Sequence, residues 1–221
     1  MRKALQQNRT FLILYALFFC IALPLILFSD KIELHRFFNK AVTPALNGFF
    51  EYVTYLGDGI FSVVVALILL FFNVRKSLTV LIAYCLSAGF TQAIKYAFFG
   101  DADRPELMFA KLHLPPLTLV QNMAEEQHVL HSFPSGHATA AFALFFCLGF
   151  FAEKNINKLI CFLLALTVAF SRVYLSQHFF EDITAGSFIA VFYSSLVCTF
   201  FYFSKASQRF TKFDVPIYKL F

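Results

Sequence analysis

Six long apolar segments limit the fold of this chain more than any other feature of its sequence. A helix needs about 20 residues to cross the hydrocarbon layer of a membrane, and about 17–25 are tolerated. Backbone polar groups in lipid must be hydrogen-bonded internally, which a helix achieves within one segment. The sequence therefore predicts an all-α membrane protein with six transmembrane helices, forming a single domain over residues 1–221. The segments are Phe11–Phe28, Tyr52–Phe72, Leu78–Phe99, Ala138–Ala152, Leu159–Leu175 and Ile183–Phe203.

The composition agrees with a protein surrounded by lipid. Charged residues make up 14% of the chain, whereas soluble domains carry about 25%. The net charge of +5 does not indicate nucleic-acid binding, because its excess follows the expected membrane topology. With a cytoplasmic N-terminus, 11 of the 18 basic residues fall in the inner segments, as the positive-inside rule requires, and both termini are then cytoplasmic. These basic residues are Arg2, Lys3, Arg9, Arg75, Lys76, Lys154, Lys158, Lys205, Arg209, Lys212 and Lys219.

Two of the apolar segments have features of their own. Ala138–Ala152 is short, and it reaches membrane length only if its helix begins near Ser135, which places His137 at the membrane surface. Phe11–Phe28 follows basic residues and has a cleaved signal peptide as its alternative interpretation. We expect it to be retained as an anchor, because no small-x-small cleavage site precedes Asp30 and the run exceeds the usual 7–15 residues.

Three polar stretches place ionisable residues at the ends of these segments. The first holds Lys95 and the Arg104-Pro105 pair, the second is Pro134–His137, and the third runs from Ser171 to Asp182. Ionisable residues at the edge of a membrane are costly to bury and mark functional sites by default. With cytoplasmic termini, all three stretches lie on the outer face.

The second stretch has the properties of an anion site at the start of a helix. Ser135 is a favourable N-cap, and Gly136 lets the backbone approach a ligand closely. The free N–H groups and the dipole of a helix N-terminus attract anions, and His137 in the first turn would face the same anion. The alternative is a capped helix with an interfacial histidine.

The third stretch suggests an oriented histidine nucleophile. His178 and Asp182 are four residues apart, so on one helix they share a face. A carboxylate that holds one ring nitrogen frees the other nitrogen to attack. Arg172 offers a planar fork for two phosphate oxygens. The alternative is an ion-paired loop between two helices.

The first stretch would complete a phosphate cradle. Lys95 lies near the end of its segment, so it could instead extend outward as an interfacial anchor. Pro105 restricts Arg104 to extended backbone, which makes this arginine a rigid donor.

These motifs resemble those of the type 2 phosphatidic acid phosphatases (PAP2), also called lipid phosphate phosphatases, which share a helical core with vanadium haloperoxidases. The family pattern is K-x6-RP, then PSGH, then SR-x5-H-x3-D. The second element matches in full at Pro134–His137, and the third matches in full from Ser171 to Asp182.

The first element departs from the family pattern. Lys95 and Arg104 are separated by eight residues instead of six, and the position that would match is occupied by Ala97. Two residues inserted around Gly100 would leave the role with Lys95, and Lys111 is the alternative lysine.

The resemblance implies a set of roles for the site residues. His178 would attack phosphorus and form a phosphohistidine, Asp182 would orient it, and His137 would protonate the leaving oxygen and later activate water. The phosphate would be held without a metal or other cofactor. The phosphate-binding residues would be Lys95, Arg104, Ser135, Gly136 and Arg172.

The loop before the PSGH element offers a metal site as an alternative. Glu125, Glu126, His128 and His131 form an E-E-x-H-x-x-H cluster, and zinc does bind histidines at short spacing. The cluster lacks the HExxH order, so we expect a solvated polar loop and no metal.

The sequence thus predicts a metal-independent membrane phosphatase acting on a phosphomonoester or diphosphate of a lipid at the outer leaflet. Candidate substrates are lipid A, undecaprenyl diphosphate, phosphatidylglycerol phosphate and phosphatidic acid, the first two being favoured. A lipid-to-lipid phosphotransferase and a non-enzymatic membrane protein or transporter on the same scaffold are the alternatives. The short chain with basic inner loops suggests a bacterial inner membrane, with the site facing the periplasm or exterior. The oligomeric state does not follow from the sequence.

Overall fold

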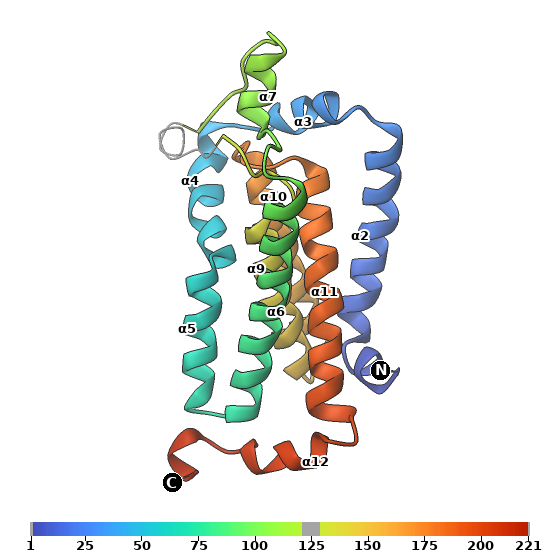
Figure 1. Cartoon of the computed structure of the whole chain (residues 1–221), viewed down its shortest axis with the longest axis vertical. Helices are drawn as coiled ribbons and strands as arrows, with labels where there is room; N and C mark the ends of the chain where they lie inside the picture. The colour runs from blue at the N-terminus through green and yellow to red at the C-terminus, as the bar shows by residue number, and fades with distance from the viewer. Residues whose placement is uncertain (1, 121–128, 221) are drawn as a thin grey trace.

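The computed structural model describes residues 2–120 and 129–220, with only the backbone described for residues 2–4, and both ranges are mainly helical (Figure 1). The described residues contain no β-strand. The elements are α1 (Arg2–Gln7), α2 (Arg9–Phe28), α3 (Lys31–Asn39), α4 (Pro44–Val53), η1 (Thr54–Gly57), α5 (Gly59–Leu70), α6 (Val74–Phe98), α7 (Pro105–Lys111), α9 (Gly136–Phe151), α10 (Asn155–Tyr174), α11 (Phe180–Phe203), α12 (Ser207–Phe210), η2 (Thr211–Phe213) and η3 (Ile217–Lys219).

All six predicted apolar segments contain helix, which confirms the all-α prediction, but the number of six spans is not confirmed. Four helices, α2, α6, α10 and α11, are each long and apolar enough to cross a membrane. The segment Tyr52–Phe72 is divided, because the chain bends by 59° between η1 and α5. At this bend Asp58 caps α5 by accepting a hydrogen bond from the Ile60 amide at 3.1 Å, and Gly57 precedes it. Counting the bent pair as one span gives five.

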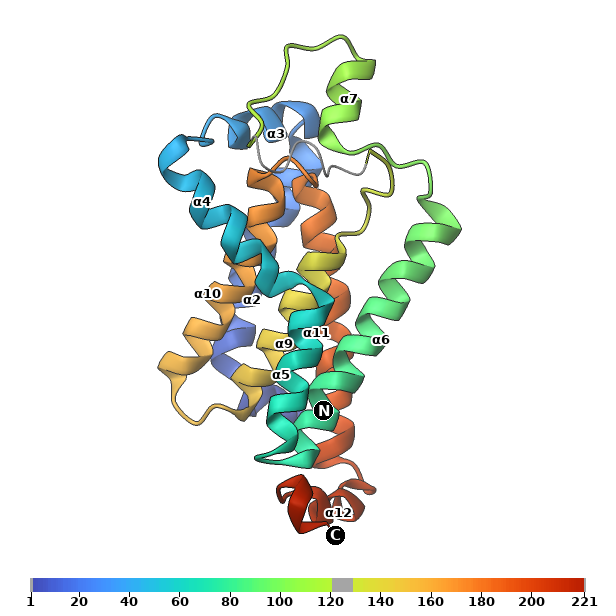
Figure 2. The same ribbon diagram turned by 90° about the vertical axis from the view of Figure 1, so that its left-hand side faces the viewer.

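The remaining apolar helix, α9, has 16 residues and lies inside the bundle (Figure 2). It begins at Gly136 with Ser135 as its N-cap, as the sequence predicts. Twelve of its residues are buried, because α6, α10 and α11 pack around it. Aromatic rings fill the space toward α2: Phe11 contacts Phe142 and Phe146 edge to face, with centroids 6.4 and 5.3 Å apart.

The two ends of the bundle differ in character. At one end lie the last turns of α2, α6 and α10 and the first turns of α9 and α11, covered by α3 and α7 (Figure 1). At the opposite end lie both termini and the α5–α6 turn. There Arg75 is buried and pairs with Asp214 at 2.6 Å, which fixes the C-terminal tail beneath α6.

Helices α9 and α11 approach each other closely at Gly186. The Thr139 hydroxyl donates to the Gly186 carbonyl at 3.3 Å, and a Cβ atom added at Gly186 would lie 2.5 Å from the Ser135 carbonyl oxygen. Small residues permit such close backbone contact between membrane helices. This contact fixes the N-terminal end of α9 against α11.

We expect Gly186→Ala to destabilise the protein by about 1–3 kcal/mol, because the added methyl group forces the two helices apart. The measurement is thermal unfolding of the purified protein in detergent. Gly89→Ala is the matched control, since a Cβ at Gly89 in α6 meets nothing within 4 Å; it should be neutral or stabilising by up to about 1 kcal/mol. Equal stability of the two variants would contradict the close packing of α9 on α11.

Candidate active site

A buried histidine–carboxylate pair lies at the junction between α10 and α11. The Nδ1 atom of His178 is 3.2 Å from Oδ2 of Asp182, and both side chains are almost completely buried. The same Oδ2 accepts hydrogen bonds from the Phe179 amide at 2.9 Å and from the Ser132 hydroxyl at 2.5 Å. Because an ionised carboxylate only accepts hydrogen bonds, His178 donates through Nδ1 and keeps a lone pair on Nε2.

The turn after α10 brings two predicted site residues together. Ser176 has a left-handed backbone conformation with φ of 53°. This conformation folds the chain back, so that the Gln177 and His178 amides both donate to the Arg172 carbonyl oxygen, at 2.9 and 3.1 Å. From α3, His35 Nε2 lies 3.2 Å from the Ser176 hydroxyl, and the Asn39 amide donates to that hydroxyl at 3.3 Å. Helix α3 therefore stabilises the turn that carries His178.

Two arginines flank this turn, and Gln177 lies between them. Arg104 donates to the Gln177 side-chain oxygen at 2.8 Å, and Arg172 donates to the same atom at 3.4 Å. Arg172 also donates to the Thr54 hydroxyl at 2.8 Å. Its Nε–H group is buried and has no partner among the described residues. The buried Arg172 cation therefore keeps an N–H donor that no described residue accepts.

Lys95 adds a third positive charge. It lies in the last turn of α6, is 7% exposed and has no hydrogen-bond partner among the described residues. Lys95 interacts electrostatically with Arg104, Asp182 and Arg172. Burial lowers the pKa of Arg104 from its usual value, which indicates that water solvates this charge poorly. The group of cations is therefore suited to an anion.

His137 completes the cluster from the first turn of α9. The charges of Arg172, Arg104 and Lys95 act on its ring, as does His178. Beside His137, the Ser135 hydroxyl caps α9 by accepting a hydrogen bond from the Ala138 amide at 3.4 Å. A Cβ atom at Gly136 would meet nothing within 4 Å, so the N-terminus of α9 is open to an approaching group.

Burial and the nearby cations Arg104, Arg172 and Lys95 lower the pKa of His178 well below its usual value of 6.5. The ring is therefore neutral at pH 7. A neutral imidazole whose Nδ1 is held by a carboxylate has a nucleophilic Nε2 atom.

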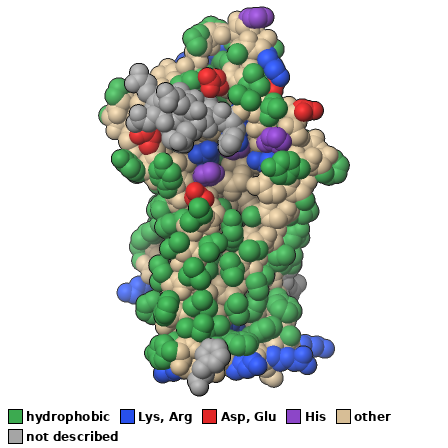
Figure 3. All heavy atoms as spheres, turned by 60° about the vertical axis from the view of Figure 1, so that its left-hand side comes forward, with side chains coloured by type: hydrophobic (Ala, Val, Ile, Leu, Met, Phe, Trp, Pro, Cys, Tyr) green, Lys and Arg blue, Asp and Glu red, His purple; other side chains and the backbone are tan. Residues whose placement is uncertain are grey.

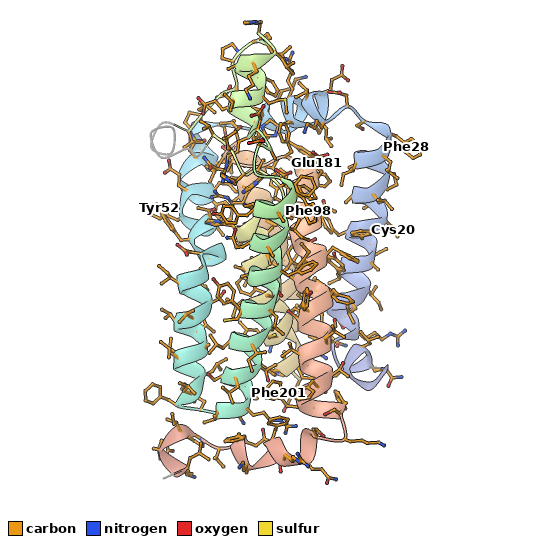
Figure 4. All side chains as sticks on the ribbon, in the orientation of Figure 1. Cys20, Phe28, Tyr52, Phe98, Glu181 and Phe201 are labelled. Atoms are coloured by element: carbon orange, nitrogen blue, oxygen red, sulfur yellow. The ribbon has the colours of Figure 1, made fainter. Side chains whose placement is uncertain are left out.

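The structure brings the predicted residues together at one end of the bundle. Figure 4 labels Glu181 and Phe98, which mark the start of α11 and the end of α6 at that end. Figure 3 shows His, Lys and Arg side chains gathered there, above the hydrophobic sides of the bundle. The residues so placed are Lys95, Arg104, Ser135, Gly136, His137, Arg172, His178 and Asp182.

The geometry distinguishes the two candidate lysines. Lys95 is buried among the cluster, whereas Lys111 is 56% exposed and pairs with Asp103 at 2.7 Å. The two extra residues of the first motif are therefore accommodated after α6, in the loop that leads to Arg104.

Three members of the candidate metal cluster, Glu125, Glu126 and His128, lie outside the described residues. Its fourth member, His131, contacts Tyr96 edge to face with ring centroids 5.1 Å apart. Within residues 2–120 and 129–220, no group of three His, Cys, Asp or Glu residues could hold a metal.

Several residues of the site were missed by sequence reasoning. Ser132, Gln177, Thr54 and His35 all bond to the cluster or to its turn. Gln177 and Ser132 carry a weak signal, because each is a polar residue next to a motif. Thr54 and His35 carry none, because they lie far from the motifs in sequence.

The fold and the cluster together define a class: an integral membrane helical protein with a buried site of two histidines, one carboxylate and three cations. The family model described as PAP2 superfamily matches residues 76–206, more than half of the chain. The chain belongs to the PAP2 superfamily, as its motifs predict.

Solved structures share the fold. LpxE of Aquifex aeolicus is 27% identical with a TM-score of 0.66, over 77% of this chain and 95% of that one. A transmembrane PAP2-type phosphatidylglycerolphosphate phosphatase from Bacillus subtilis is 21% identical with a TM-score of 0.59, over 90% and 96%. No curated protein matches the sequence.

We expect His35 to make the protein sensitive to acid. Burial lowers the pKa of His35 from 6.5 to about 4, so the folded state binds its proton less readily than the unfolded state does. The stability that this group contributes is present above pH 6.5 and is lost as the pH falls toward 4. The loss of unfolding free energy amounts to about 2–3 kcal/mol at pH 4.5. His35→Gln, which cannot titrate, should lose correspondingly less stability between pH 7 and pH 4.5.

The measurement is chemical or thermal unfolding at the two pH values. His113→Gln serves as the control, because His113 is exposed and its replacement should leave the acid sensitivity of the wild type unchanged. An equal loss in wild type and His35→Gln would show that His35 is not buried as a neutral ring.

Proposed function

We propose that the protein is a membrane phosphatase that removes phosphate from an amphiphilic lipid through a phosphohistidine intermediate, without a metal. The observation that carries this proposal is the carboxylate-held His178 beside the buried cation Arg172, whose Nε–H group has no partner among the described residues. A nucleophile and an anion cradle in the same buried place suit phosphoryl transfer, where catalysis consists mainly of positioning and charge stabilisation.

The phosphate would bind through its non-bridging oxygens. Lys95, Arg104 and Arg172 would supply cations, and Arg172 retains its Nε–H group for this purpose. Gly136 would contribute its backbone N–H group at the start of α9. Ser135 would contribute its hydroxyl group, because its own amide already donates to the Asp182 carbonyl oxygen at 3.0 Å. Charge-assisted hydrogen bonds of this kind are about twice as strong as neutral ones.

In the first step, Nε2 of His178 attacks phosphorus while the bond from phosphorus to the lipid oxygen breaks. The departing oxygen takes a proton from His137, so the lipid leaves as an alcohol, or as a monophosphate if the substrate is a diphosphate. The bound phosphate balances the surrounding positive charges, which allows this proton to reside on His137. Asp182 holds the cation that forms on the His178 ring.

In the second step, water attacks the phosphohistidine. His137 accepts a proton from this water, and the bond between phosphorus and Nε2 of His178 breaks. Inorganic phosphate leaves, and both histidines return to their starting states. An acceptor alcohol in place of water would give a phosphotransferase with the same residues.

The proposed orientation places the site at the outer face of a bacterial inner membrane, with six spans and cytoplasmic termini. The end of the bundle that carries the termini also carries exposed basic side chains, which supports this orientation. Arg2 and Lys3 belong to the same prediction, but their side chains are outside the described part of the chain. The exposed basic residues are Arg9, Lys154, Lys205, Arg209, Lys212 and Lys219.

The substrate is proposed as a class, a lipid that carries a phosphomonoester or diphosphate. Lipid A and undecaprenyl diphosphate are the first candidates, followed by phosphatidylglycerol phosphate and phosphatidic acid. The fold shared with a phosphatidylglycerolphosphate phosphatase places that lipid in the test panel. Comparing kcat/KM across the four lipids would identify the preferred one.

We expect the purified protein to release phosphate from at least one of these lipids in excess chelator. His178→Ala should lower the rate by at least about 10³-fold, because it removes the nucleophile. The measurement is released phosphate together with an acid-labile phosphoenzyme trapped from radiolabelled substrate. His113→Ala, at an exposed position, should retain full activity. Turnover by His178→Ala, or a strict need for divalent metal, would reject the mechanism.

We expect Lys95→Ala to reduce kcat/KM by about 10²-fold or more, because it removes a buried cation from the transferring phosphoryl group. Lys111→Ala is the matched control, since this exposed lysine pairs with Asp103 at the surface, and it should cost less than about threefold. Steady-state kinetics on the best substrate decide between them. A larger loss from Lys111→Ala would assign the role in phosphate binding to Lys111.

A further inference from the structure

Thr54 is bonded to the proposed phosphate-binding arginine from a distant part of the chain. Its hydroxyl accepts a hydrogen bond from the NH1 atom of Arg172 at 2.8 Å, across a sequence separation of 118 residues. Thr54 is 1% exposed and Arg172 is 6% exposed. Thr54 lies outside residues 76–206, the part of the chain that the family model matches.

Thr54 lies just before the bend in the second apolar segment. It follows α4 and begins η1, and the chain turns by 59° into α5 a few residues later. Both α4 and η1 contact α10, and the Thr54 hydroxyl meets Arg172 of α10 there.

Two acceptors together fix the guanidinium group. Thr54 binds NH1 of Arg172, and the Gln177 side chain binds NH2 at 3.4 Å. A guanidinium group is planar and has no acceptor of its own, so two bonds at separate nitrogens determine its plane. The Nε–H group, which is buried and has no partner among the described residues, is then fixed in direction as well.

The same bend supports the other side of the site. A Cβ atom at Gly57 would lie 3.0 Å from the His137 carbonyl oxygen and 3.2 Å from the His137 Cβ. The charge of Asp58 acts on Arg172, although its Oδ1 atom accepts the Ile60 amide. The bend therefore contacts both the cradle and the proposed proton donor.

We propose that Thr54 is a positioning residue that holds Arg172 ready for a phosphate anion, an inference that rests on the proposed phosphatase function. Thr54 does not touch the reacting atoms and acts through Arg172. The anion concerned is the tetrahedral phosphate group of the substrate and its trigonal-bipyramidal analogue, vanadate. Misplacement of a binding group by about 1 Å can cost on the order of 10²-fold in rate.

The test replaces the hydroxyl of Thr54 with a methyl group of the same shape. Thr54→Val should lower kcat/KM about 10- to 100-fold and weaken vanadate inhibition by a similar factor, because a hydrogen bond to a charged group is lost. Thr54→Ser restores the acceptor and should stay within about threefold of the wild type. Thr79→Val is the matched control: Thr79 is buried, and its hydroxyl donates to the carbonyl of Arg75 in its own helix at 2.7 Å, at the end of the bundle opposite the site, so vanadate inhibition should not change.

A double-mutant comparison separates positioning from a general loss of structure. In an Arg172→Lys background, Thr54→Val should cost less than about threefold, because the group that Thr54 orients is gone. A full additional loss there, or unchanged vanadate inhibition in Thr54→Val alone, would overturn the inference. If Thr54→Val does not fold, Thr54→Cys supplies a weaker acceptor of similar volume. Vanadate should inhibit Thr54→Cys less strongly than the wild type and Thr54→Ser, but more strongly than Arg172→Lys. Inhibition equal to that of the wild type would overturn the inference.

The outcome is distinguishable from a failure of the proposed function. If the wild-type protein releases no phosphate and is not affected by vanadate, the phosphatase proposal fails as a whole. If the wild type is active and Thr54→Val matches it, only the role of Thr54 is rejected.

Discussion

One buried residue, Asp182, holds two separate parts of the chain against the first turn of α11. Its side chain accepts bonds from His178, from the Phe179 amide and from the Ser132 hydroxyl, and its backbone carbonyl accepts the Ser135 amide at 3.0 Å. The turn before α9 and the turn before α11, which carries His178, are therefore fixed to the first turn of one helix. Because a buried charge is tolerated only when it is fully hydrogen-bonded, this residue stabilises the site and specifies its geometry at the same time.

The site nevertheless holds more positive charge than this carboxylate can balance. Lys95, Arg104 and Arg172 lie around one ionised acid, with Gln177 and Thr54 supplying neutral acceptors. Burying uncompensated cations costs free energy, and the deficit is recovered when an anion binds. The packing of α9 against α10 and α11 therefore has to offset the cost of burying these charges.

The sequence predicts the motif residues of the site better than the residues that contact them from distant parts of the chain. His178, Asp182 and His137 were found because motif spacing of four residues, or a helix N-cap, fixes their local geometry. The start of α9 at Gly136 followed from Ser135 in the same way. Thr54 could not be found, because its contact with Arg172 joins residues 118 apart in the sequence; Thr54 also lies just before a bend in an apolar segment that reads as one continuous span. The Gly57-Asp58-Gly59 sequence was a signal for that bend, because glycine and an N-cap aspartate favour a helix break. His35 was equally hidden, as α3 meets the His178 turn only in the folded chain.

The shortness of α9 has a consequence for how a lipid reaches the protein. At 1.5 Å per residue its 16 residues extend about 24 Å, less than the roughly 30 Å of a hydrocarbon layer. In the orientation proposed above, with the C-terminal end of α9 level with the cytoplasmic boundary, its N-terminal end would lie about 6 Å below the opposite headgroup plane. A phosphorylated lipid, the proposed substrate, would then lower its polar head slightly and keep its tails among the neighbouring acyl chains. Its dephosphorylated product would stay in the bilayer and diffuse away laterally.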